Sequence, residues 1–223
     1  FPLSEVLRQS WRYRFDYSEI DNVASNASNL IKAQKGDRYL SLVGHNLFYD
    51  TRDSRINPTE GFGARLANDV AGLGGTVFYF RNLLSVNQYY SLAPGWILSA
   101  DGTVGHILGL GEDVEIPDRF FLGGDSLRGF ASAGVGPRDR TTKDSLGGEW
   151  TYHGGLQLRV PLGLPDELGI SGRVFTDFGS LGSVSPSDSN VFDSGSLRAS
   201  VGAGVGWMSP FGPINVDLGW AVL

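Results

Sequence analysis

Long runs in which apolar and polar side chains alternate are the feature that most constrains this sequence. In the clearest run, Leu197, Val201 and Val205 alternate with polar or small residues such as Arg198. A period of two is the side-chain period of a β-strand. We predict nine such strands, at about 6–17, 37–50, 61–71, 75–91, 95–108, 150–160, 170–178, 197–207 and 214–222.

The lengths of these strands and of their connections indicate a membrane barrel. Many of the predicted strands reach ten or more residues, whereas strands of soluble proteins usually have about five or six. Short turns on one side and mostly longer loops on the other are typical of an outer-membrane β-barrel. A soluble β-sandwich also alternates, with its apolar faces packed inward, and it remains the alternative architecture.

The order of the connections assigns them to two sides. The turns expected to face the periplasm are 51–60, 91–94, 162–167 and 209–212. The loops expected to face outward are 18–36, 72–74, 109–147 and 179–195, with Gly72, Gly74 and Gly75 marking a tight turn.

Composition agrees with an all-β antiparallel transmembrane barrel. No window approaches 18 consecutive apolar residues, which excludes transmembrane helices. The chain has 32 Gly, 13 Phe, 8 Tyr, 5 Trp and no Cys, which favours a barrel over a disulfide-stapled secreted domain. A net charge of −6 argues against a nucleic-acid partner. The chain starts at Phe1 and stops at Leu223 within an alternating run, so we expect a piece of a larger protein.

The central loop, 109–147, contains the glycine-rich segment FFLGGDSLRGF at residues 120–130. Arg128 stands there in a Leu127-Arg128-Gly129-Phe130 sequence, preceded by the Gly123-Gly124 pair. An arginine stays charged and offers five donors, so inside a barrel it needs acceptors. The alternation of the seventh strand places Phe175 and Asp177 on its polar face. The other interpretation of Arg128 is a solvated loop arginine.

Several stretches resemble the BamA superfamily of barrel assembly factors and two-partner secretion transporters. FFLGGDSLRGF is similar to the arginine-glycine-phenylalanine signature of the superfamily, and VFTDFG at 174–179 to the barrel-wall strand that faces it. DTRDSRINPTEG at 50–61 and WMSPFGPINVDLGWA at 207–221 resemble the assembly factors rather than the transporters. The resemblance spans nearly the whole chain and corresponds to the bacterial surface antigen domain.

The resemblance implies the later nine strands of a barrel of about sixteen. The first strands, the periplasmic helper domains and a final aromatic-ended strand would then lie outside the sequence. The strands at 6–17 and 213–223 would have unsealed edges, which are costly in lipid, so we expect pairing between copies, detergent cover or disorder there.

The resemblance also places Asp177 and Phe175 opposite Arg128. We therefore predict that loop 109–147 folds into the lumen, with Arg128 hydrogen-bonded to Asp177 and stacked on Phe175. Gly123, Gly124 and Gly129 would permit the tight hairpin. The family often has a carboxylate at the position of Gln157, which can accept a hydrogen bond here but supplies no charge.

Other constellations of polar residues carry no predicted chemistry. The acidic residues Glu112, Asp113, Glu115 and Asp118 match no calcium loop and are expected to be solvated charges. His45, His106 and His153 lack metal-ligand spacing. Asp50, Arg52, Asp53 and Arg55 are expected to form a local ion-pair cluster. We predict no catalytic, cofactor or metal site.

By resemblance, the parent protein inserts and folds client β-barrels in the bacterial outer membrane. The partners implied are unfolded clients, accessory assembly lipoproteins and lipid, and this chain would supply scaffold and lumen loop. One alternative is a two-partner secretion transporter that exports a protein. Another is the barrel anchor of a patatin-like outer-membrane hydrolase, which an upstream nucleophile elbow would reveal.

Overall fold

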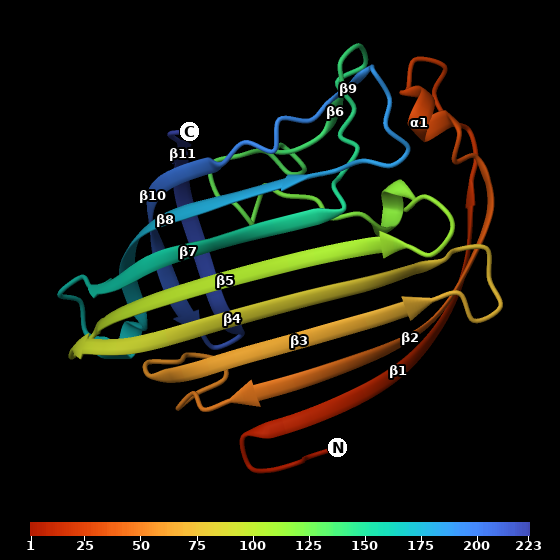
Figure 1. Ribbon diagram of the computed structural model, residues 1–223. Helices are drawn as coiled ribbons and strands as arrows, with labels where there is room; N and C mark the ends of the chain where they lie inside the picture. The colour runs from red at the N-terminus through yellow and green to blue at the C-terminus, as the bar shows by residue number, and fades with distance from the viewer.

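Nine long antiparallel strands form one sheet, in which every strand pairs with its neighbour in the chain (Figure 1). The computed structural model describes residues 1–223, and all of their side chains except that of Asp166. The strands are β1 (Leu7–Ile20), β2 (Gly36–Asp50), β3 (Gly61–Ala71), β4 (Tyr79–Ala93), β5 (Trp96–Gly109), β7 (Trp150–Pro161), β8 (Ile170–Gly182), β10 (Arg198–Ser209) and β11 (Gly212–Ala221). The nine predicted strands are confirmed.

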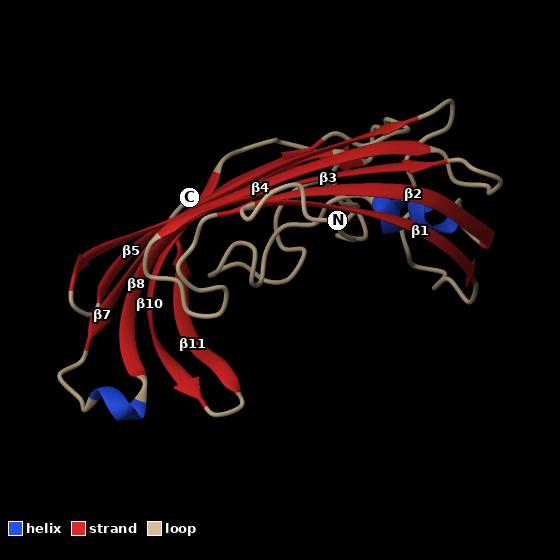
Figure 2. Cartoon of the chain, turned by 90° about the horizontal axis from the view of Figure 1, so that it is seen from below, coloured by secondary structure: helices blue, strands red, loops and turns tan.

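The sheet is strongly curved; some loop segments lie beneath the arch, and the other connections lie at the strand ends (Figure 2). β1 and β11 are its two edges, so the sheet is an open segment of a barrel wall. The chain start folds back on the edge of β1, where the amide of Gln9 donates to the carbonyl of Phe1 at 2.9 Å. Among the described residues, no helix is long and apolar enough to cross a membrane.

The two faces of the sheet differ as the alternation predicts. The convex face carries exposed apolar side chains from edge to edge, with Trp11 on β1 61% exposed and Trp220 on β11 59% exposed. The concave face carries glycines, arginines and carboxylates, together with the apolar residues that the loops cover. Apolar residues pointing away from the molecule suit contact with lipid. The sandwich alternative is wrong, because its apolar faces would be buried against each other.

The apolar core lies between the concave face and the segment that follows β5. One cluster joins β2, β3, β4 and β5 to this segment; its members are Leu40, Leu42, Ala71, Val77, Tyr79, Ile107, Val114 and Phe120. A second cluster joins the same segment to β8 and consists of Leu122, Leu127, Val135 and Leu181, with Phe130 packed against it. The segment is therefore part of the folded core.

The loops contain more structure than predicted. α1 (Asn29–Lys32) lies between β1 and β2, η1 (Ile116–Asp118) follows β5, and η2 (Asp166–Leu168) precedes β8. Two short strands, β6 (Arg138–Asp139) and β9 (Val191–Phe192), pair with each other and connect the loop between β5 and β7 to the loop between β8 and β10. The sequence did not predict these elements because segments of two to four residues are too short to show a period.

The predicted tight turn at 72–74 is wrong in length. The connection runs over residues 72–78, and β4 starts at Tyr79 rather than near residue 75. The reason is that this connection pairs with β2: the amide of Thr76 donates to the carbonyl of Tyr39 at 2.9 Å. Val77 is buried beside Leu40 in the core, which fixes the path of the chain.

Candidate functional site

The hairpin of residues 120–130 crosses the concave face and is held there by its leucines. Leu127 is fully buried against Leu122, Val135 and Leu181, which brings Arg128 to the wall of β8. The amide of Gly124 donates to the carbonyl of Phe130 at 3.0 Å and closes the hairpin. Burial of this apolar cluster thus positions the arginine.

Arg128 contacts both residues of β8 that the family resemblance placed opposite it. Its Nε and Nη2 donate to the two carboxylate oxygens of Asp177, each at 2.7 Å, and its backbone amide donates to Oδ2 at 3.1 Å. The guanidinium carbon lies 3.4 Å from the ring centroid of Phe175. A bidentate arginine–carboxylate pair fixes direction as well as distance.

Gln157 on β7 is the third predicted wall residue, and it accepts a hydrogen bond from Arg128 Nη1 at 2.9 Å. Asp217 on β11 was missed: its Oδ2 lies 3.2 Å from the same nitrogen, and its Oδ1 accepts from Arg173 Nε at 2.6 Å. The alternation of β11 puts Asp217 on the concave face, which was a usable signal. The distance along the chain gave no sign that the hairpin reaches β11.

The resulting network contains two arginines and two aspartates. Burial acts to lower the pKa of the Arg128 guanidinium, but the hydrogen bonds and charges of Asp177 and Asp217 outweigh it and raise that pKa. Removal of water strengthens such pairs and makes an unpaired charge costly. The site can therefore hold the hairpin against three strands of the wall.

The glycines of the motif have backbone conformations that other residues rarely adopt. The φ angles of Gly123, Gly124 and Gly129 are +128°, +60° and +89°. A Cβ on Gly129 would also come within 3.1 Å of the backbone of Gly219 on β11. The hairpin thus touches the wall directly at this point.

A second set of contacts holds the start of the same loop on the other half of the sheet. Arg38 on β2 pairs with Glu115 at 2.5 Å and with Asp118, and the Arg38 side chain is only 9% exposed. The prediction of solvated charges is therefore wrong for Glu115 and Asp118. The partner arginine lies about 80 residues earlier in the chain, so local spacing could not reveal it.

Arg119 connects three loop segments through backbone carbonyls. Its guanidinium donates to the carbonyls of Val114 at 2.8 Å, of Leu146 at 3.2 Å and of Ser185. Burial lowers the pKa of Arg119. The start of the central loop is thereby tied to the loop between β8 and β10.

The remaining predicted clusters are structural. Arg52 donates to Asp50 at 2.8 Å, and Arg55 lies 3.8 Å from the same carboxylate. Asp53 instead accepts hydrogen bonds within the turn, led by Thr59, which lower the pKa of its carboxyl group. His45, His106 and His153 lie on three different strands. In the part of the chain that the structure describes, no three potential metal ligands gather.

Comparisons with known proteins agree on one family. Residues 1–222 match the model of the Omp85 superfamily domain. The chain is 36% identical over 225 residues to the outer membrane protein assembly factor BamA of Neorickettsia risticii, covering 100% of this chain and 30% of that protein. BamA of Nitratidesulfovibrio vulgaris is 30% identical over 223 residues, covering 98% of this chain and 28% of the relative.

The similarity extends to a eukaryotic protein and to a solved structure. The sorting and assembly machinery component 50 homolog of Xenopus tropicalis is 31% identical over 162 residues, covering 71% of this chain and 34% of the relative. The crystal structure of BamA from Haemophilus ducreyi lacking POTRA domains 1–3 superimposes with a TM-score of 0.80 at 20% identity, covering 100% of this chain and 49% of that one. The chain spans less than a third of the length of the BamA relatives.

Proposed function

Because this chain belongs to the Omp85 superfamily, we propose that it forms part of the wall and the internal loop of a β-barrel, and that this barrel folds and inserts other β-barrel proteins. Its place is the outer membrane of Gram-negative bacteria. The observation that carries the proposal is the 36% identity, over all of the chain, to a protein named as an assembly factor. The partners proposed are unfolded clients, accessory assembly lipoproteins and outer-membrane lipid.

The role proposed for this chain is mechanical rather than enzymatic. Loop 109–147 occupies the lumen, and the docking of Arg128 on Asp177 and Phe175 fixes that loop to the wall. Insertion would then use a strand edge that offers free backbone donors and acceptors to an incoming strand. A rigid internal loop supports this route because it keeps the curvature of the wall constant while the seam changes.

The relatives named above favour assembly over the two alternatives. Proteins called assembly factors and assembly machinery components match most or all of the chain. Export of a partner exoprotein and anchoring of a hydrolase find no comparable support among these names. We therefore carry assembly forward as the single proposed function.

The proposal is tested by reconstituting the protein in liposomes and adding a urea-denatured β-barrel client. The expected result is faster appearance of client that migrates as a folded barrel on a gel without boiling. Liposomes that hold an unrelated barrel at equal protein mass are the control. Equal rates in the two preparations would refute an assembly role, and client recovered inside the liposomes rather than in the bilayer would indicate export.

A further inference from the structure

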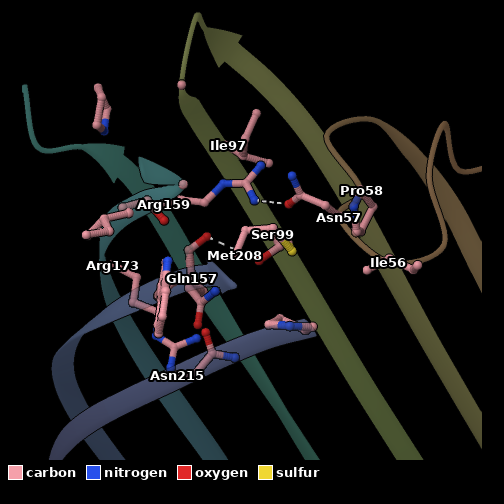
Figure 3. A pocket seen from close by; sticks show the side chains of 18 of the residues that line it. Ile56, Asn57, Pro58, Ile97, Ser99, Gln157, Arg159, Arg173, Met208 and Asn215 are labelled. Carbon is pink, nitrogen blue, oxygen red and sulfur yellow. Dashed lines mark hydrogen bonds between the residues drawn. The ribbon is translucent and has the colours of Figure 1, made fainter. Parts of the chain in front are cut away.

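A cavity of about 450 Å³ opens on the concave face where β4, β5, β7, β8, β10 and β11 meet their short turns (Figure 3). Its lining includes two cationic side chains, Arg159 on β7 and Arg173 on β8. The turn at 51–60 reaches across to it and contributes Asn57 and Pro58. The cavity adjoins the Arg128 network, because Gln157 lines it and also accepts from Arg128, but Asp177 and Phe175 are not part of its lining.

The two arginines are direct cross-strand partners, and within the described residues only one of them has an ion-pair partner. Like charges in this position destabilise a sheet. Arg173 is neutralised by Asp217, whose carboxylate lies 2.6 Å away. Arg159 donates to the amide oxygen of Asn57, and none of the ion pairs among the described residues includes it.

A half-buried guanidinium with a neutral partner is an unfavourable arrangement. Arginine remains charged at all accessible pH values, and its planar group is suited to bidentate contact with an oxyanion. The amide oxygen of Asn57 satisfies one donor and supplies no charge. Figure 3 shows the guanidinium of Arg159 pointing to Asn57 at the rim of the cavity.

We propose that Arg159 anchors a binding site for a carboxylate carried by a polypeptide segment. The ligand's carboxylate would take the position of the Asn57 side chain, which belongs to an exposed part of the turn. A single negative charge matches Arg159, which has no ion-pair partner among the side chains that the structure describes, while Arg173, the other arginine of the cavity, is paired with Asp217; phosphate at neutral pH carries about −1.5 to −2.

The walls of the cavity also favour a peptide over an inorganic anion. Apolar side chains of Ile97, Pro58 and Met208 lie beside the polar groups of Ser99 and Asn215. Such a mixture suits a side chain with an apolar stem and its adjoining peptide groups. A bare oxyanion would leave the apolar walls unused.

The test measures binding of blocked, dye-labelled tripeptides to the protein in lipid nanodiscs, by fluorescence anisotropy. The peptides are Ala-Glu-Ala and its isosteric control Ala-Gln-Ala, each with an uncharged dye. We expect the glutamate peptide to bind about tenfold more tightly, the scale of one charge-assisted hydrogen-bonded pair. Arg159→Gln should abolish this difference.

Two further variants make the result specific. Arg65→Gln is the matched control, because Arg65 also faces inward and also donates to an asparagine, Asn46, at 2.9 Å, but does not line the cavity. Arg65→Gln should leave the preference for glutamate intact. Asn57→Ala should raise the affinity for the glutamate peptide, since the peptide carboxylate then no longer competes with the Asn57 side chain for Arg159.

Three outcomes would overturn the proposal. The first is equal affinity of the two peptides for the unmodified protein. The second is a preference for glutamate that persists in Arg159→Gln. The third is displacement of the glutamate peptide by equimolar inorganic phosphate, which would assign the cavity to small oxyanions. If Arg159→Gln does not fold, the Asn57→Ala variant tests the proposal. A higher affinity of Asn57→Ala for the glutamate peptide cannot result from misfolding and supports the proposal. An unchanged affinity would show that the peptide does not compete with Asn57 for Arg159 and would contradict it.

Discussion

Within the central loop, the segment from Phe120 to Arg128 is held at its two ends by arginine–phenylalanine contacts in which loop and wall exchange residue types. At one end Arg128 of the loop stacks on Phe175 of the wall at 3.4 Å. At the other end Arg81 of the wall lies over Phe120 of the loop at 4.5 Å. Small wall residues make room for the rings: a Cβ on Gly105 would come within 2.7 Å of the Phe120 ring, and Gly202 lies against Phe175 in the same way.

The two ends differ in how the arginine charge is balanced. Arg128 has a bidentate carboxylate, Asp177, and a second carboxylate, Asp217. Arg81 is the cross-strand partner of Asp69, but Asp69 is paired with Arg12 at 2.6 Å. The first end therefore depends on directional charge pairs. The second depends on the burial of Phe120 in the apolar cluster.

The largest effect is expected from Asp177→Ala at the charged end. This change leaves Arg128 partly buried with one weaker carboxylate contact, and loss of one partner of a buried pair typically costs about 3–5 kcal/mol. Limited proteolysis of the protein in nanodiscs should show faster cleavage within residues 110–149. Asp69→Ala, which removes the partner of the more exposed Arg12, is the control and should change cleavage little. Unchanged protease sensitivity of Asp177→Ala would contradict the importance of this pair.

Phe120→Ala should have the next largest effect. The side chain is buried at 6% exposure, and truncation of a buried phenylalanine costs about 3 kcal/mol or more in soluble cores. Hydrogen exchange should increase for residues 110–120 while the hairpin around Arg128 keeps its protection. Phe121, which is 42% exposed, provides the matched control Phe121→Ala. Equal loss of protection at both ends would show that the loop opens as one unit.

The third prediction concerns Asp217, the carboxylate that the sequence analysis missed. Asp217→Asn removes the counter-charge of Arg173 and one partner of Arg128, so we expect loop opening to become easier by about 2 kcal/mol. Gln157→Glu in the same protein should restore much of the protection, because Gln157 already accepts from the same Nη1 at 2.9 Å.

A double-mutant cycle over these two positions measures their coupling. Additive effects of the two substitutions would show that the charge near Arg128 cannot be supplied from β7. Protease sensitivity of the loop is the measured quantity in all four proteins. Binding of the tripeptides should be followed in parallel, since Arg173 also lines the neighbouring cavity.

The same contrast explains how much could be predicted. The number of strands in the large sheet and the face that each side chain occupies follow from a period of two, which is a local property. Both agree with the nine-stranded sheet of the structure. The opposition of Arg128 to Asp177 and Phe175 came from family resemblance, because 49 residues separate Arg128 and Asp177 along the chain. Asp217 and the Arg38 pairs were missed, since alternation reports which face a residue occupies but not which strands a loop crosses.

The smallest effect is expected from Arg81→Gln at the apolar end. A cation–π contact contributes about 0.5–1 kcal/mol when partly exposed, so the loop should open only slightly more easily. Arg128→Gln provides the comparison. It should lower the free energy of loop opening several times more than Arg81→Gln, because it also removes the ion pairs with Asp177 and Asp217. Hydrogen exchange of residues 110–130 measures both ends in one experiment. If Arg81→Gln exposes the Phe120 end as strongly as Arg128→Gln exposes the hairpin, stacking on arginine rather than charge pairing holds both ends, and the distinction drawn between them fails.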